Sequence, residues 1–205
     1  GLNDGQKAAV KHINGPALTT ATAGAGKTST IVKRTQYMIA NGVDPSNILL
    51  TTFTNKAANE MKERIIDKVG DKGRRITVGT YHSICNRILR QYADRLDYTK
   101  TFTIMDENDT DKIIKQLSKA YNIDSDLIKC SIAAFKAHYQ TPQQAMNKAT
   151  NDSEKQVANM YQLYQDELKR QMAMDFDDLI FNTIKLLESF TDVREEINNR
   201  WRYIS

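Results

Sequence analysis

The stretch Thr20-Ala21-Thr22-Ala23-Gly24-Ala25-Gly26-Lys27-Thr28-Ser29 decides how the first part of this sequence folds. It follows a short apolar run at residues 16–19, which we expect to form a buried strand, and it precedes apolar residues with helical spacing at 31–39. A strand, a glycine-containing turn, a Lys-Thr pair and a helix are together typical of a phosphate-binding loop. The sequence therefore predicts a nucleotide-phosphate site at this turn.

Each residue type in the turn has a chemical role. Gly24 and Gly26 let the backbone curl so that its N–H groups point at one anion, and the helix that begins near Lys27 adds the positive end of its dipole. Lys27 can reach the outer phosphates, and the Thr28 hydroxyl can bind Mg²⁺. The common pattern has Gly six residues before the Lys, where this sequence has Ala21. The alternative interpretation is a chance glycine-rich turn before a helix.

Composition limits the classes of protein to be considered. The chain has 205 residues, of which 40% are hydrophobic and 26% charged, as in ordinary globular domains. Its net charge of +4 permits a polyanionic partner without requiring one. Cys85 and Cys130 lie far apart and match neither a disulfide framework nor a paired metal site, so we expect reduced thiols in a cytoplasmic protein. No apolar run reaches the length of a membrane span, and we expect no membrane partner.

The first hundred residues alternate between strand and helix patterns. Residues 47–53 and 76–80 are β-rich runs, while residues 54–69 carry an apolar stripe with helical spacing. This alternation predicts an α/β fold with a parallel, doubly wound sheet, in which ligands collect at the carboxyl ends of the strands. Two such ends are expected at Phe53 and at residues 80–83. The polar face of the helix over 54–69 comprises Lys56, Glu60, Lys62, Glu63 and Arg64.

From residue 99 the pattern becomes helical. Helices are expected over 106–121, 125–138, 142–148 and 152–170, with residues 102–104 as the one strand candidate. We interpret residues 99–172 as a helical insertion. It is basic in places, at Lys112, Lys115, Lys119, Lys129 and Lys136.

Acidic residues mark the starts of two later helices. Asp175 has Asp178 three residues on, and Asp106 has Asp109 at the same spacing, which is typical of helix N-caps. A metal site at residues 175–178 is the alternative, but the capping interpretation is simpler. The expected apolar face of the helix after Asp175 comprises Phe176, Leu179, Ile180, Ile184 and Leu187.

Taken in order, these motifs resemble those of the UvrD/Rep/PcrA-type superfamily 1 DNA helicases. Leu2-Asn3-Asp4 with Gln6 resembles the family's adenine-reading Q motif. Residues 21–28 resemble its phosphate loop, which often has Ala at the first position, although Thr22 and Ala25 stand where Gly and Ser or Thr are more usual. Thr52-Phe53-Thr54-Asn55-Lys56-Ala57-Ala58 resembles motif Ia. Thr80-Tyr81-His82-Ser83 resembles the next motif, and Asp175-Phe176-Asp177-Asp178-Leu179 resembles the segment that returns from the insertion.

The resemblance implies a RecA-like ATPase domain over residues 1–98, a helical insertion over 99–172 and a return to the ATPase domain over 173–205. It also implies ATP and Mg²⁺ as cofactors, and single-stranded DNA and duplex junctions as partners. The implied nucleotide-binding residues are Gln6, Ala21, Thr22, Ala23, Gly24, Ala25, Gly26, Lys27, Thr28 and Ser29, with Lys27 and Thr28 catalytic and Thr28 a Mg²⁺ ligand. The implied DNA-binding residues are Phe53, Thr54, Asn55, Thr80, Tyr81, His82 and Ser83.

The activity implied is that of an ATP-dependent DNA helicase, moving 3′ to 5′. The family's Asp-Glu motif, arginine fingers and second motor domain would lie beyond residue 205, so we expect these 205 residues alone to bind Mg·ATP and single-stranded DNA weakly and not to unwind. From position alone, Gln6 would be a solvated helix residue, Phe53 a core aromatic and His82 a capping or packing histidine. A small-molecule kinase and a non-catalytic nucleic-acid-binding module stay open as alternatives.

Overall fold

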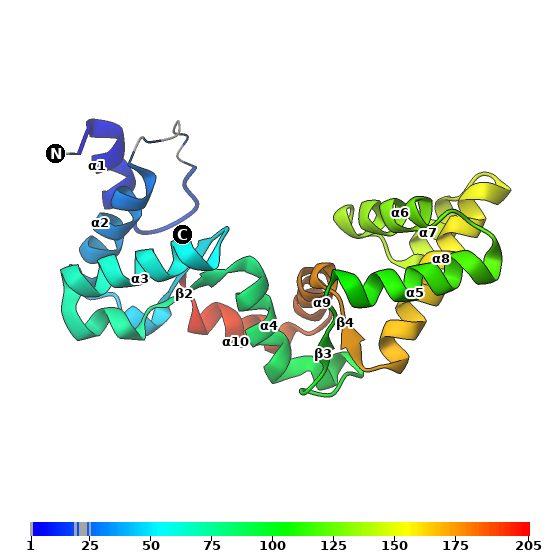
Figure 1. Ribbon diagram of the computed structural model, residues 1–205. Coiled ribbons are helices and arrows are strands. Elements are labelled where there is room, and N and C mark those ends of the chain that lie inside the picture. Colours follow the sequence, from blue (N-terminus) through cyan, green and yellow to red (C-terminus); the bar gives the residue numbers. More distant parts are fainter. Residues whose placement is uncertain (1, 19, 21–23, 25) are drawn as a thin grey trace. The chain divides into compact units, whose positions relative to one another are not determined.

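The structure, a computed structural model, describes residues 2–18, 20, 24 and 26–205 (Figure 1). Contacts divide the chain into two compact units, one made of residues 1–84 and 192–205 and the other of residues 85–191. None of the helices in the described part of the chain combines the length and the apolar composition that crossing a bilayer would require.

The first unit is built on a three-stranded parallel sheet with the order β2-β1-β5. Its strands are β1 (Ile48–Thr52), β2 (Thr77–Thr80) and β5 (Tyr203–Ile204). The helices are α1 (Asp4–Lys11), α2 (Lys27–Ala40), α3 (Asn55–Val69), the start of α4 (Tyr81–Tyr92) and α10 (Thr191–Arg200), with the 3₁₀ segments η1 (Pro45–Asn47) and η2 (Gly70–Arg75). The predicted parallel α/β sheet is therefore confirmed.

The core of this unit lies between β1 and the helices α2 and α3. Ile48 and Leu50 of β1 are fully buried, as is Met38 of α2, and Ile65 of α3 is nearly so. These are the apolar positions that repeat with strand or helix period along the chain, so burial of each stripe against its neighbour stabilises the unit.

The prediction of a strand at residues 16–19 is wrong for residues 16–18, the part of this range that the structure describes. Residues 16–18 are irregular, residue 19 lies outside the described residues, and Leu18 is 91% exposed. β1 already pairs on one side with β2 and on the other with β5, and β5 is only two residues long. Over the residues that the structure describes, the run at 16–18 pairs with no strand, and it is not packed into the apolar core.

The second unit is mostly helical. After η3 (Ala93–Leu96) its elements are β3 (Thr103–Ile104), α5 (Glu107–Tyr121), α6 (Ser125–Ala137), α7 (Pro142–Lys148), α8 (Asp152–Arg170), β4 (Ala173–Met174) and α9 (Phe176–Ser189). The predicted helices are confirmed to within a residue or two, and side-chain caps explain their starts: Asp106, Asp124, Thr141, Asn151 and Asp175 each accept a hydrogen bond from the first turn.

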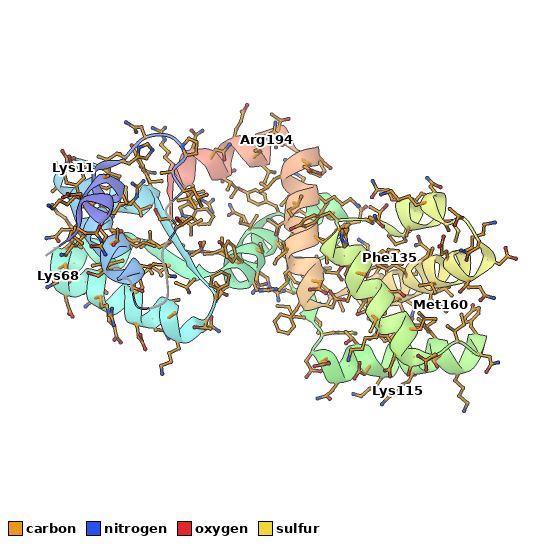
Figure 2. All side chains as sticks on the ribbon, turned by 90° about the horizontal axis from the view of Figure 1, so that it is seen from above. Lys11, Lys68, Lys115, Phe135, Met160 and Arg194 are labelled. Atoms are coloured by element: carbon orange, nitrogen blue, oxygen red, sulfur yellow. The ribbon has the colours of Figure 1, made fainter. Side chains whose placement is uncertain are left out.

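The core of the second unit is a separate apolar cluster among α5, α6, α7 and α8. Met160 of α8 and Phe135 of α6 both belong to this region (Figure 2), and Met160 is almost fully buried. The Phe135 ring stacks on Tyr161 with ring centroids 5.5 Å apart. β3 pairs in parallel with β4, a strand that the sequence did not predict. α9 packs on α6 and on η3, and the second unit spans residues 85–191.

Lys136, one of the basic residues of the predicted insertion, is buried. Its side chain is 1% exposed, and its Nζ lies 2.6 Å from Asp175 Oδ2 and 2.9 Å from Asp178 Oδ1. The Tyr164 hydroxyl donates to Asp175 over 2.7 Å, and the Gln165 amide donates to Asp178 over 3.1 Å. Burial alone would lower the pKa of Lys136, but the charges of Asp178 and Asp175 outweigh it and raise that pKa, so the ammonium stays charged inside the unit.

This buried cluster also changes the expected face of α9. Asp175 and Asp178 form the predicted capping box, but Asp178 itself is buried, with Leu179, Asn182, Thr183 and Leu186. Phe176, expected in the apolar face, is 54% exposed. The face of α9 that packs inward is therefore rotated toward the aspartates, because Lys136 on α6 requires their charge.

Replacing Lys136 by Met should destabilise the chain by about 3–5 kcal/mol, because two buried carboxylates lose their cation. Urea unfolding followed by circular dichroism measures the loss. The matched control is Lys129→Met, since Lys129 pairs with Glu107 and Asp111 at the surface, where ion pairs contribute little. Equal destabilisation by the two variants would contradict the importance of the buried cluster.

Stability should also fall as the pH rises above about 10, the ordinary pKa of tyrosine. Burial, and next the charge of Asp175, raise the pKa of Tyr164. The unfolded chain then loses this proton at a pH where the folded chain keeps it, which favours unfolding. Tyr164→Phe should give a flatter decline in urea midpoint between pH 9 and pH 11, and an unchanged slope would contradict this assignment.

Candidate nucleotide and nucleic-acid site

Gln6 lies beside the glycine turn, where α1 packs along α2 (Figure 1). Asn3 and Gln6 form a capping box: the Asn3 N–H donates to Gln6 Oε1 over 2.9 Å, and the Gln6 N–H donates to Asn3 Oδ1 over 2.8 Å. A Cβ atom added at Gly26 would lie 3.2 Å from Gln6 Nε2. The cap thus holds the half-buried Gln6 side chain beside the turn.

The turn itself is described at Gly24 and Gly26, whereas Ala21, Thr22, Ala23 and Ala25 lie outside the described residues. Both glycines have φ of +77°, a left-handed conformation that side chains disfavour. Gly26 caps α2 without any side-chain hydrogen bond, so the first N–H groups of this helix have no capping side chain. Such a helix start fits an anionic phosphate.

The residues after Gly26 lie in the first turn of α2. Lys27 and Ser29 are exposed and Thr28 is half-buried, so the ammonium and both hydroxyls are accessible. Thr30, by contrast, is buried, and its hydroxyl donates to the Gly26 carbonyl over 3.0 Å. Thr30 thus fixes the geometry of the turn, and Lys27, Thr28 and Ser29 carry the groups that could hold Mg·ATP.

Two exposed aromatic side chains meet at the carboxyl edge of the sheet. Thr52 pairs with Thr80 in the register of β1 and β2, so Phe53 and Tyr81 follow the two strands at the same edge. Phe53 is 92% exposed and Tyr81 51%, and their ring centroids lie 6.2 Å apart in an edge-to-face arrangement. The interpretation of Phe53 as a core aromatic is therefore wrong, and its ring is available for stacking.

Polar groups surround this aromatic pair. Thr54 caps α3 by accepting from the Ala57 N–H over 3.1 Å, and the Thr80 hydroxyl accepts from the Ser83 N–H over 3.2 Å. Each hydroxyl acts as an acceptor in its cap, which leaves its own hydrogen for a ligand. Asn55 is exposed and His82 is half-buried in the first turns of α3 and α4.

Gly79 makes the turn after β2 possible. The Ser83 hydroxyl donates to the Thr80 carbonyl over 2.9 Å, and a Cβ atom at Gly79 would lie only 2.5 Å from Ser83 Oγ. Any side chain at position 79 would therefore displace Ser83 from the position expected for nucleic-acid binding.

A cavity of about 240 Å³ connects the two predicted sites within the first unit. Thr28 lines one part of it, and Phe53 and Thr54 line another. Glu60 and Arg64 of α3 also line this cavity, although the sequence predicted only that they would face outward. Their spacing of one helical turn was the available signal, but periodicity does not distinguish a solvent-facing side chain from one beside a cavity.

Acidic residues at two helix starts act as caps. Asp106 accepts from the Asp109 N–H over 3.0 Å, so its predicted role as an N-cap is confirmed. Among the residues that the structure describes, no three His, Cys, Asp or Glu side chains are placed so as to hold a metal ion. Thr28 stays the predicted Mg²⁺ ligand, and its hydroxyl lies in the first turn of α2 after Gly26.

Comparison with known proteins gives consistent matches. Residues 2–205 match the family described as the UvrD/REP helicase N-terminal domain. The ATP-dependent DNA helicase PcrA of Staphylococcus aureus is 43% identical over 99% of this chain, and that of Staphylococcus epidermidis is 41% identical over the same share. The chain spans about 29% of the length of these relatives.

Gly79→Ala should destabilise the chain by roughly 1–3 kcal/mol, because the new methyl group overlaps Ser83 Oγ. The loss should be smaller in a Ser83→Ala background, where the overlapping oxygen is absent. A double-mutant cycle of urea unfolding measures this coupling. Additive losses from the two substitutions would show that the close approach of Gly79 to Ser83 is not the source of the strain.

Proposed function

Because the chain belongs to the family of UvrD/REP helicase N-terminal domains, we propose that it is the amino-terminal part of an ATP-dependent DNA helicase that moves 3′ to 5′ on single-stranded DNA. The observation that carries this proposal is the cavity that Thr28 shares with Phe53 and Thr54. A nucleotide site and a strand-binding edge that border one cavity are suited to coupling hydrolysis to movement.

In the nucleotide half of the site, the residues present fit Mg·ATP. The left-handed glycines and the uncapped start of α2 suit the phosphates, Lys27 supplies a positive charge, and Thr28 supplies the hydroxyl that would bind Mg²⁺. The Gln6 amide, held by its capping box, would bind the edge of the adenine. ATP hydrolysis supplies the free energy, and the role of these residues is to bind and orient the nucleotide.

In the DNA half, Phe53 would stack on a base while Tyr81 supports it from the side. Stacking of this kind contributes about 1–3 kcal/mol per base and tolerates any sequence, as a translocating enzyme requires. Thr54, Asn55, Thr80, His82 and Ser83 would contact the bases or phosphates around it. The first unit carries fifteen Lys and Arg residues against nine Asp and Glu, which suits a polyanion.

For the organisation of the chain, we propose a RecA-like ATPase domain over residues 1–98 and 173–205 with a helical insertion over 99–172. The parallel sheet of the first unit and the separate apolar core of the second support this division. We further propose single-stranded DNA and duplex junctions as partners, and a cytoplasmic location.

Lys27→Ala and Phe53→Ala should separate the two halves of this function when introduced into the full-length helicase. Lys27→Ala should abolish DNA-stimulated ATP turnover while oligo-dT binding persists. Phe53→Ala should weaken oligo-dT binding about tenfold or more, because one stacking contact is lost, and should leave the urea midpoint nearly unchanged, because its ring is exposed. Fluorescence anisotropy and a coupled ATPase assay measure the two effects.

Three outcomes would contradict the proposal. If DNA left the affinity for the nucleotide unchanged, and Phe53→Ala had no effect, a small-molecule kinase would be favoured. If the wild-type protein turned over no ATP, and Lys27→Ala changed neither folding nor binding, a non-catalytic nucleic-acid-binding module would be favoured. ATP turnover by residues 1–205 alone would contradict the proposal that this chain acts only as part of a longer enzyme, and Asp106 would then be the first candidate for the catalytic carboxylate.

A further inference from the structure

Glu60 and Arg64 are two opposite charges that do not pair. They lie one turn apart on α3, in the order and spacing at which Glu and Arg commonly form an ion pair. Within the described part of the chain, neither side chain makes a hydrogen bond or an ion pair, and both are exposed and line the cavity beside Thr28. The Arg64 guanidinium therefore keeps all of its donors for a ligand.

The cavity around Arg64 is suited to a phosphate group. The guanidinium is a planar donor that binds phosphate oxygens in pairs, and hydroxyl donors from Thr28 and Thr54 line the same space. Ala57, Met61 and the ring of Phe53 form the apolar part of the lining, which limits hydration of a bound anion, and Thr52 lines the cavity as well. Glu60 is the one carboxylate that lines the cavity among the described residues.

We propose that Arg64 is a phosphate-binding residue of the helicase and that Glu60 tunes its affinity by repelling the same phosphate. This inference rests on the proposed function, because the phosphate would come either from the end of the nucleotide held at Thr28 or from the DNA strand that stacks on Phe53. Either source would place Arg64 between the two sites, where it can make the affinity for one ligand depend on the other.

Removing the charge of Arg64 and removing the charge of Glu60 should change the affinity for the ligand in opposite directions. In the full-length helicase, Arg64→Met should weaken binding of the ligand that supplies the phosphate by about tenfold, the usual effect of losing a charge-assisted hydrogen bond. Glu60→Gln should strengthen binding of the same ligand, because a negative charge beside the phosphate is removed. A merely structural role of α3 would move both variants in the same direction.

Two titrations distinguish the sources of the phosphate. If the nucleotide supplies it, Arg64→Met raises the dissociation constant of a nonhydrolysable Mg·ATP analogue and leaves that of Mg·ADP unchanged. If DNA supplies it, Arg64→Met weakens oligo-dT binding and lowers the slope of log affinity against log salt by about one. The coupling between the two ligands, measured by titrating each in the presence of the other, should decrease in both cases.

Matched controls lie on the same helix. Lys68 lies exposed one turn beyond Arg64 (Figure 2). Neither Lys68 nor Glu63 is among the residues that line the cavity. Lys68→Met and Glu63→Gln change the same charges without reaching the cavity. The inference would be overturned if Arg64→Met weakened ligand binding no more than Lys68→Met does. It would also be overturned if Glu60→Gln lowered the affinity. A wild-type protein that binds neither ligand would instead overturn the proposed function.

Discussion

The hydrogen-bonded register between β1 and β2 is the constraint on which the candidate site depends. Leu49 pairs with Thr77 and Thr52 pairs with Thr80, so the chain leaves both strands at the same edge. The register is fixed by burial, because slipping β1 by one residue would turn Ile48 and Leu50 away from the core. The apolar core thus determines where Phe53 and Tyr81 meet, although neither ring belongs to it.

Local signals in the sequence were sufficient for most helices and for the longer strands. Caps such as Thr54, Asp106 and Asp175 fix where helices begin, and each acts over three residues, within the reach of a sequence pattern. What the sequence did not reveal depends on partners far along the chain. Lys136 bonds to Asp178 across 42 residues, and β4 exists only as the partner of β3. The strand expected at residues 16–19 pairs with no strand over the residues that the structure describes.

The candidate site likewise contains features that local sequence determines and features that depend on distant parts of the chain. The glycine conformations, the approach of Gln6 to the turn and the exposure of Phe53 agree with expectations drawn from motifs, since each motif carries its own local geometry. The positions of Glu60 and Arg64 beside Thr28 could not be predicted, because they depend on how α3 packs against α2. An amphipathic pattern identifies the polar face of a helix but not what that face meets.

The partners of a charged side chain indicate whether its charge stabilises the fold or is available to a ligand, and each unit contains one example. Lys136 is surrounded by Asp175, Asp178 and the Tyr164 hydroxyl, so its charge is neutralised inside the protein and serves the fold. Arg64 borders a cavity, and within the described residues no carboxylate binds it, although Glu60 stands one turn away. Burying an unpaired charge is costly, so folding selects partners for Lys136, whereas an exposed guanidinium can remain unpaired at little cost. A charge that folding leaves unsatisfied beside a phosphate loop is therefore available for ligand binding.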